Sequence, residues 1–289
     1  MSTTTTTSRP DASRAAGGGR VARFFRYPLT WALTGAVGVG AVAGLTAQRE
    51  PLTVVPVLGA VLAVIVYRVV MRFVARRPTP EIAARRAVSE ALLGAVLGLG
   101  FVAASASIVT ALGGYTFRGA GTDVPAVVAP VLTVMLGVAV TEELMFRGFG
   151  LQAVERLAGS WGALLVTALF FGLVHLLNPG ATPWTALAIT IEAGGLLGAA
   201  FLWRRNLWFV IGLHLAWNAT VALLGLPVSG HAGQGLLVAD VSGPALLTGG
   251  AFGIEGSLVT VTVGVLLAVP MLVLARRRGT LVPAARRRP

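Results

Sequence analysis

The sequence predicts an all-α, polytopic transmembrane helical bundle of about eight helices, and three observations support this fold class. The 289 residues are 55% apolar and only 12% charged, against about 25% charged in a typical soluble domain. Apolar runs recur along the chain, each close to the roughly 20 residues that a helix needs to cross a bilayer. The charges that remain are mostly Arg, and they gather between these runs. The protein is therefore expected to be a multi-pass protein of a cell membrane, and its Ala- and Arg-rich composition indicates a bacterial one.

The predicted spans are separated by short breaks rich in Pro, Gly or Arg. They are residues 28–47, 52–74, 88–112, 124–146, 160–177, 183–203, 206–224 and 257–275. Many Gly and Ala residues inside them favour close helix packing in lipid. The Thr-, Gly- and Arg-rich start has no apolar run and is expected to be disordered. The predicted organisation is a disordered cytoplasmic tail (1–27), a transmembrane domain (28–276) and a basic cytoplasmic tail (277–289).

The arginines predict the orientation of the bundle. With the N-terminus inside and eight alternating helices, 21 of the 23 positive charges fall inside, and only Arg49 and Arg118 fall outside. Cytoplasmic loops carry the excess of basic residues, so both termini are expected in the cytoplasm. The net charge of +12 does not indicate nucleic-acid binding, because the arginines lie between apolar runs rather than on one face. The chain has no Cys, which excludes disulfides, thiol nucleophiles and thiolate metal sites.

Polar side chains inside the predicted spans are the candidate functional residues, since an ionisable group at the centre of a membrane helix costs roughly 2.5–3.5 kcal/mol. Glu143 and Arg147 are four residues apart and predict an ion pair along one side of a helix. Glu142 points about 100° away from that side and stays free. His214 and Asn218 likewise share a helix face. The full set is Glu142, Glu143, Arg147, His175, Glu192, His214 and Asn218.

Glu192 from this set, and two ionisable residues outside it, have weaker assignments. Glu192 could face a substrate, or it could be a packing partner for a His or for Arg147. His231 lies in a Gly-rich loop and is expected to be incidental. Glu255 precedes the last span and is expected to cap that helix, because an anion is favoured at a helix N-terminus.

A hairpin near Gly159 would bring the first two motifs to the same height. Glu142 lies 17 residues before this turn and His175 lies 16 after it, which is about 25 Å at 1.5 Å per residue. His214 lies about 13 Å beyond the following turn at residues 204–205. If the first hairpin protrudes about 10 Å into the cytosol, the groups meet. These distances predict a pocket on the cytoplasmic side.

The chemistry that this cluster suits is amide hydrolysis. Glu142 would act as the general base that deprotonates a water molecule. His175 would orient that water or protonate the leaving amine, and His214 and Asn218 would donate hydrogen bonds to the developing oxyanion. Alternatively, Glu142, His175 and His214 could bind Zn²⁺. The sequence contains no HExxH motif, so zinc and metal-free mechanisms both remain open.

In order along the chain, the motifs read Glu142-Glu143 with Arg147, Phe171 with His175, and His214 with Asn218. They resemble the EExxxR, FxxxH and HxxxN motifs of the CAAX protease and bacteriocin-processing (CPBP, or Abi) family of intramembrane peptidases, over roughly residues 124–224.

The resemblance implies that Glu142 is the catalytic glutamate and that His175, His214 and Asn218 are its active-site partners. Glu143 and Arg147 would hold the helix geometry. Both metallo- and metal-free glutamate mechanisms are associated with the family. Its eukaryotic members trim prenylated CAAX proteins, whereas a bacterial member is expected to act on another membrane-associated peptide or protein.

Two other functions fit polar residues within a membrane. A secondary transporter or proton-coupled carrier also uses intramembrane Glu and His. However, the polar motifs do not recur in two halves of the chain, as they do in many transporter folds. A non-catalytic scaffold or immunity protein could use the same fold without hydrolysing anything.

Overall fold

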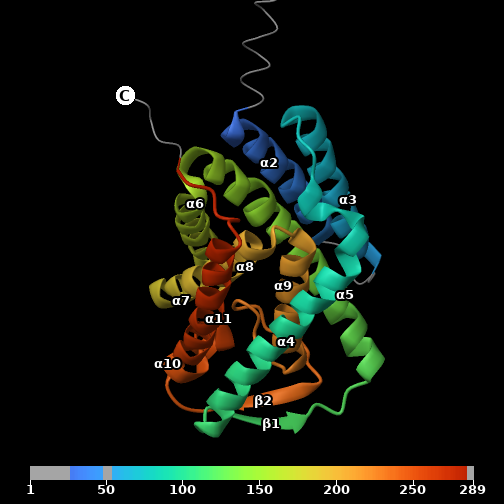
Figure 1. The fold of residues 1–289 in the computed structure, drawn as a ribbon. Helices are drawn as coiled ribbons and strands as arrows, with labels where there is room; N and C mark the ends of the chain where they lie inside the picture. The colour runs from blue at the N-terminus through green and yellow to red at the C-terminus, as the bar shows by residue number, and fades with distance from the viewer. Residues whose placement is uncertain (1–26, 48–53, 285–289) are drawn as a thin grey trace, which may run out of the picture.

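The computed structural model describes residues 27–47 and 54–284, so most of the predicted N-terminal tail and the last five residues lie outside the described part (Figure 1). The α-helices are α2 (Pro28–Ala47), α3 (Val54–Val69), α4 (Ala87–Ala111), α5 (Val124–Glu143), α6 (Gln152–Val174), α7 (Pro183–Ile189), α8 (Leu196–Arg204), α9 (Leu207–Leu223), α10 (Ala245–Thr248) and α11 (Leu258–Arg277). The π-helical segments Val70–Val74, Leu144–Leu151 and Thr190–Gly195 continue α3, α5 and α7. Short 3₁₀ turns are Pro80–Ile82, Ala84–Arg86, His175–Leu177, Gly250–Phe252 and Ile254–Gly256.

Every segment predicted to span the membrane is helical, which confirms the all-α, multi-pass membrane fold class. Within the described residues, six stretches are long and apolar enough to cross a bilayer: Pro28–Thr46, Val54–Val74, Ala84–Ala111, Val124–Leu177, Pro183–Arg204 and Leu258–Arg277. The 54-residue stretch holds two predicted spans divided at Gly159, whose φ of 72° breaks the helix and suits glycine. Helix α9 is also apolar, but it is shorter than these six candidate membrane spans. Eight crossings and cytoplasmic termini remain predictions.

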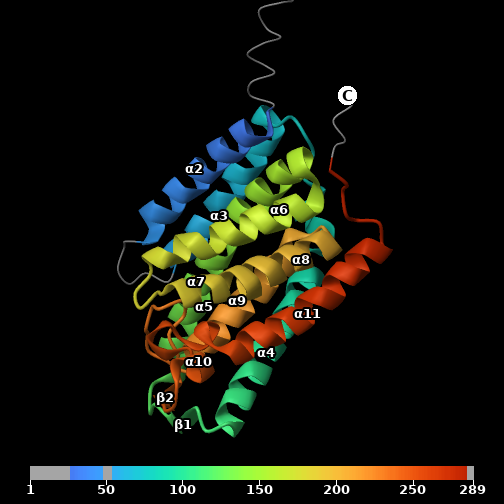
Figure 2. The same cartoon turned by 90° about the vertical axis from the view of Figure 1, so that its left-hand side faces the viewer.

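The bundle has two distinct ends, which we call the terminal end and the loop end. The described chain begins and finishes at the terminal end (Figures 1 and 2). The C-terminal segment fixes the turns between helices at Gly159 and at Arg205. Ser160 N donates to Val282 O at 2.8 Å, and Arg205 donates to Thr280 O. The loop end holds residues 112–123, 178–182 and 224–257. The part of α6 after Gly159 and the whole of α9 therefore run from the terminal end towards the loop end.

The loop end contains a two-stranded antiparallel sheet that the sequence analysis did not predict. Strand β1 (Tyr115–Gly119) pairs with β2 (Leu237–Val241), with Tyr115 opposite Val241. The hydroxyl of Tyr115 donates to Thr248 O, and burial raises the pKa of this hydroxyl, so it remains a donor. The strands link two connections that are far apart in the sequence, and thereby close this end of the bundle (Figure 1).

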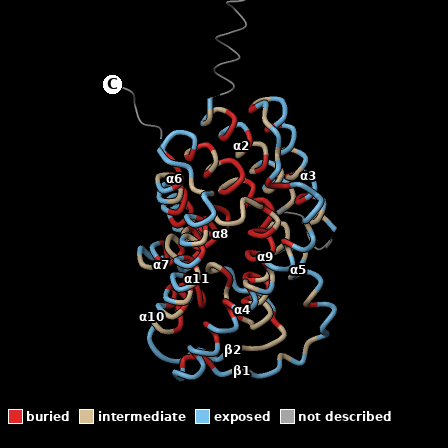
Figure 3. The backbone as a smooth tube through the Cα atoms, viewed as in Figure 1, coloured by how far each residue is buried: buried red, intermediate tan, exposed pale blue. Residues whose placement is uncertain are grey.

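Helix α9 is buried along most of its length (Figure 3), because glycines let the backbone of α4 approach it closely. A Cβ added to Gly94 would lie 1.9 Å from Phe209 O, and one added to Gly98 would lie 2.2 Å from Leu213 O. In the reverse direction, a Cβ on Gly212 would lie 2.0 Å from the carbonyl oxygen of Ala91. The small residues of these spans thus set the position of the helix that carries His214.

We expect Gly98→Ala to destabilise the protein by about 1–3 kcal/mol, the usual cost of overpacking a close contact. The new methyl group can be accommodated only if α4 and α9 move apart. Gly100→Ala is the matched control on the same helix, because nothing lies within 4 Å of its added Cβ, and alanine is the better helix former. The measurement is thermal unfolding in detergent. Equal midpoints for the two variants would contradict this account of the packing.

Candidate active site

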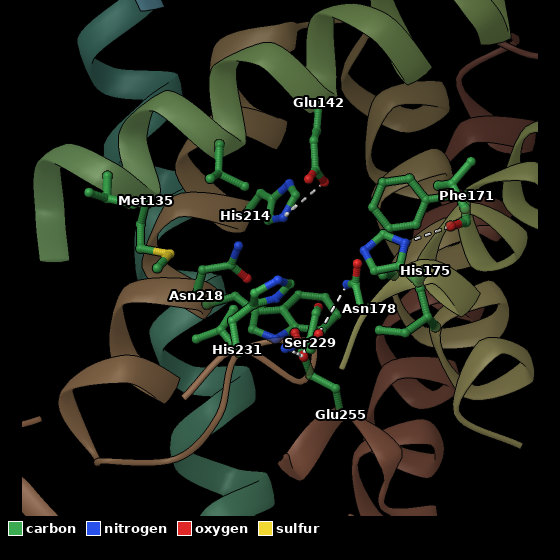
Figure 4. Close-up of a pocket in the computed structure, with 17 residues that line it drawn as sticks. Met135, Glu142, Phe171, His175, Asn178, His214, Asn218, Ser229, His231 and Glu255 are labelled. Carbon is green, nitrogen blue, oxygen red and sulfur yellow. Dashed lines mark hydrogen bonds and ion pairs between the residues drawn. The ribbon is translucent and has the colours of Figure 1, made fainter. Parts of the chain in front are cut away.

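A cavity of about 440 Å³ lies between α5, α6, α9 and the connections of the loop end (Figure 4), a volume in the range of small-ligand sites. Residues from all three motifs line it. The lining comprises Val134, Met135, Val138, Glu142, Phe171, Val174, His175, Asn178, Ile189, Ala193, His214, Trp217, Asn218, Val228, Ser229, His231 and Glu255. The four predicted catalytic side chains are therefore brought together in one cavity.

Glu142 enters the cavity from the last turn of α5, with 26% of its side chain exposed. Its Oε2 lies 3.9 Å from Nε2 of His214. Asn218 follows one turn later on α9 and lines the same wall. Figure 4 shows these side chains directed towards the cavity from facing helices. Glu142 is thus a half-buried carboxylate with open space before it.

Behind this wall, a buried network fixes the orientation of His214. Nη1 of Arg147 donates to Oε1 of Glu143 at 2.9 Å, with the side chains 2% and 0% exposed. This confirms the predicted ion pair. The same Glu143 oxygen lies 2.7 Å from Nδ1 of His214. Because a carboxylate oxygen can only accept hydrogen bonds, Nδ1 is a donor, and the ring presents Nε2 towards Glu142.

The guanidinium of Arg147 also joins two of the three π-helical segments, Leu144–Leu151 and Thr190–Gly195. Its Nη2 donates to the carbonyl oxygens of Ala193 and Gly194 at 2.8 and 3.3 Å. Its Cζ lies 4.8 Å from the centre of the Phe171 ring. π-helical turns are rare and frequently occur at functional sites. Arg147 therefore holds the segment after α5 against the segment after α7.

His175 reaches the cavity from the 3₁₀ turn at the end of α6. Its Nδ1 lies 2.7 Å from Phe171 O. A carbonyl oxygen can only accept, so Nδ1 is the donor and Nε2 of the neutral ring is an acceptor. The Phe171 ring packs against the imidazole at a centroid distance of 4.7 Å. The FxxxH spacing thus positions the histidine through both the backbone and the ring of Phe171.

The cavity lies towards the loop end of the bundle, whereas the sequence analysis predicted a pocket on the side that carries the termini. It includes Asn178, Ser229, His231 and Glu255 from the connections at the loop end. His175 itself lies only three residues before the start of the 178–182 connection. The predicted meeting of the motif residues is correct, but its place relative to the termini is wrong.

The sequence pattern did not predict the wall at the loop end. Ser229 donates to Oε2 of Glu255 through its backbone N and through its Oγ, the latter at 3.0 Å. Nδ2 of Asn178 donates to Ser229 O at 3.0 Å. Glu255 is 2% exposed and does not cap α11 as expected, since Ser257 accepts from the Val259 N–H instead. A carboxylate among Phe, Ile and Gly residues was the signal that could have identified this buried role.

Two other assignments also change. His231, expected to be incidental, lines the cavity. Glu192 is fully buried and is absent from the lining, so it does not face a substrate there. Neither of its carboxyl oxygens has a hydrogen-bond partner among the described residues. It is therefore not hydrogen-bonded to Arg147 or to a histidine, the alternatives proposed from the sequence.

Glu255 predicts a pH-dependent stability. Burial raises the pKa of its carboxyl from an ordinary value of 4.5 to about 7, despite the opposing hydrogen bonds from Ser229. Between these values the folded protein binds more protons than the unfolded chain. The free energy of unfolding therefore falls as pH rises from about 4.5 to about 7. The expected decrease is on the order of 2 kcal/mol. Thermal unfolding in detergent across this range checks it. Glu255→Gln should lack this component, and parallel curves for the two proteins would contradict the assignment.

The predicted metal ligands do not form a ready metal site. Among the described residues, no group of three His, Asp or Glu side chains is arranged to hold a metal ion. The histidines of the motifs each use Nδ1 within the protein, on Glu143 and on Phe171 O. Glu142, His175 and His214 line the same open cavity, and a metal-bound histidine ordinarily donates its other ring N–H to a carboxylate or carbonyl, so the zinc and the metal-free alternatives both remain predictions.

Comparison with known proteins agrees with the resemblance seen in the sequence. Residues 124–220 match the family described as type II CAAX prenyl endopeptidase Rce1-like. No curated protein and no solved structure matches the chain. The matched segment runs from the start of α5 nearly to the end of α9 and includes all three motifs. Residues 124–220 thus form a domain of the Rce1-like type II CAAX prenyl endopeptidase (CPBP) family.

Proposed function

We propose that the protein is an intramembrane endopeptidase that hydrolyses a peptide bond in a membrane-associated protein or peptide, with Glu142 as the general base. The observation that carries this proposal is the convergence of Glu142, His175, His214 and Asn218 on one cavity. They come from three separate helical segments of a chain whose matched domain belongs to a peptidase family.

The reaction begins with a water molecule held between Glu142 and Nε2 of His175. Glu142 takes a proton as the water oxygen attacks the carbonyl carbon of the substrate. The electron pair of the carbonyl bond moves to oxygen, where hydrogen bonds from Asn218 Nδ2 and from Nε2–H of a His214 ring that carries a proton on both nitrogens stabilise the negative charge. The tetrahedral intermediate then collapses and the C–N bond breaks. The amine leaves with the proton from Glu142, directly or through His175, and the other product is a carboxylic acid.

Glu143 and Arg147 have a positioning role in this proposal. Glu143 holds the imidazole of His214 through Nδ1 at 2.7 Å, and Arg147 pairs with that carboxylate and fixes its position. A fixed donor needs little reorganisation when charge develops on the substrate, and such preorganised donors contribute much of the stabilisation in acyl-transfer enzymes.

The shape and chemistry of the cavity fit a peptide with apolar side chains. Its apolar lining includes Val134, Val138, Val174, Ile189 and Trp217. Apolar walls with a few convergent polar groups are typical of binding sites. A segment that leaves the lipid and enters this cavity could keep its apolar side chains covered while its backbone meets Glu142.

Isotope labelling tests hydrolysis directly, whatever the substrate is. Membranes from cells that make the wild-type protein or Glu142→Gln are incubated in H₂¹⁸O, and released and retained peptides are analysed by mass spectrometry. We expect fragments with ¹⁸O in a new C-terminal carboxylate only with the wild-type protein. Substrate-dependent proton flux with intact peptides would favour a transporter. An unchanged cellular role after loss of both His175 and His214 would favour a scaffold.

A further inference from the structure

We infer that the catalytic cavity opens to the extracytoplasmic side of the membrane, so that its substrate is a protein or peptide segment lying outside the cytoplasm. The choice of substrate rests on the proposed peptidase function. The direction of the opening does not, because it follows from the charges at the two ends of the bundle and from the place of the cavity between them.

The terminal end carries nearly all of the described arginines. The connection before α4, the turn at Gly159, the start of α9 and the end of α11 all contribute to it. These arginines are Arg68, Arg72, Arg76, Arg77, Arg85, Arg86, Arg156, Arg204, Arg205, Arg276, Arg277 and Arg278. At the loop end the described residues include Arg118, which lies 3.4 Å from Asp240. Since basic residues near helix ends stay in the cytoplasm, the terminal end is the cytoplasmic one.

The cavity is closed towards the terminal end. Behind Glu142 and His214 lies the buried network of Arg147 and Glu143. Large apolar side chains continue the barrier, and each is at most 1% exposed: Leu144, Phe149, Leu151, Leu196, Leu197, Leu207 and Phe209. Beyond them, Arg204 binds Glu90 and Arg205 binds Glu155 at 2.5 and 2.6 Å. A peptide cannot reach Glu142 from that end without unpacking this layer.

The opposite side of the cavity is formed by the loop end. Asn178 and Ser229 are half-buried, and His231 is exposed. All three belong to the lining (Figure 4). The exposed His231 therefore lies at the rim of the cavity, on the end of the bundle that is poor in arginine.

This placement identifies the class of substrate by location. A lipidated C-terminal tail produced in the cytoplasm would meet the arginine-rich end, where packed side chains separate it from Glu142. An exported peptide, or the outer end of a membrane protein, would meet the rim at His231 directly. We therefore assign the second class to this protein.

Cysteine accessibility tests the assignment sharply, because the chain contains no Cys. Ala232→Cys probes an exposed position beside the rim, and Ser229→Cys probes the cavity wall. Ala83→Cys is the matched control at an exposed position of the terminal end. Each full-length variant is treated with a membrane-impermeant methanethiosulfonate reagent in intact cells and after lysis. The Glu142→Gln background separates labelling from catalysis.

We expect Ala232→Cys and Ser229→Cys to react to the same extent in intact cells and after lysis, and Ala83→Cys to react only after lysis. The reverse pattern would overturn the orientation. Reaction of Ser229→Cys only after lysis, while Ala232→Cys reacts in intact cells, would overturn the direction of the opening. Either result would leave hydrolysis itself untouched, since the ¹⁸O experiment measures that independently.

Discussion

Glu142→Gln should slow peptide cleavage by about 10²–10⁴-fold, the range that a positioned general base contributes. Glutamine has nearly the same shape and can accept a hydrogen bond, but it cannot take a proton from water at neutral pH. Because the Glu142 side chain is 26% exposed and faces open space, the substitution is expected to change stability little. The measurement is kcat at saturating substrate, in proteoliposomes, with a substrate found by ¹⁸O labelling.

Glu192→Gln provides the matched control. It removes a carboxyl that is fully buried and lies in the same membrane region, but outside the cavity lining. Cleavage by this variant should stay within about threefold of wild type, a barrier change below about 0.7 kcal/mol. A Glu142→Gln protein that cleaves at the wild-type rate would remove Glu142 as the base. Equal losses in both variants would indicate that any carboxyl in this region affects the fold rather than the chemistry.

The helices could be predicted because a bilayer imposes a simple requirement on each of them. An apolar run of about 20 residues must satisfy its backbone internally, and a helix is the way a single segment does so. The breaks between helices at Gly159 and at Arg204-Arg205 could be predicted in the same way. The ion pair of Glu143 and Arg147 followed from helical spacing alone. These features depend on local sequence, and the structure shows each of them.

The place of the cavity could not be obtained from the same counting. Glu142 and His175 lie about 25 Å along their helices from the turn at Gly159, and the hydrocarbon core is about 30 Å thick. That distance already reaches the far half of the bundle, and an assumed protrusion of the hairpin moved the site to the wrong end. In the structure Gly159 lies against the C-terminal segment near Ala284, and α6 ends at His175, close to the loop end.

The loop-end wall required contacts between distant segments. Ser229 meets Glu255 and Asn178 across 26 and 51 residues of sequence. The two strands pair across more than 100 residues. No local periodicity marks such contacts. Glu255 was consequently assigned to the nearest helix end, although its carboxylate fixes a loop of the cavity.

Arg147→Met should cost about 3–5 kcal/mol of stability, because it leaves the Glu143 carboxylate buried without its cation. The lost guanidinium also releases the carbonyl oxygens of Ala193 and Gly194. His214 then loses its fixed orientation, so kcat should fall in the fraction that stays folded. The measurements are thermal unfolding in detergent and cleavage of the same substrate. Of the ion pairs in the described residues, this is the most deeply buried.

Arg118→Met is the matched control, since Arg118 and Asp240 form an ion pair whose side chains are 64% and 63% exposed. Such exposed pairs contribute about 0–1 kcal/mol, so this variant should unfold close to wild type. Adding Glu143→Gln to Arg147→Met should restore part of the lost stability, because the unpaired charge is removed, but should not restore kcat, because Gln holds His214 more weakly than a carboxylate. Full recovery of both would show that the pair supports only the packing of the helices. Recovery of stability alone is the outcome that a positioning role for Glu143 requires.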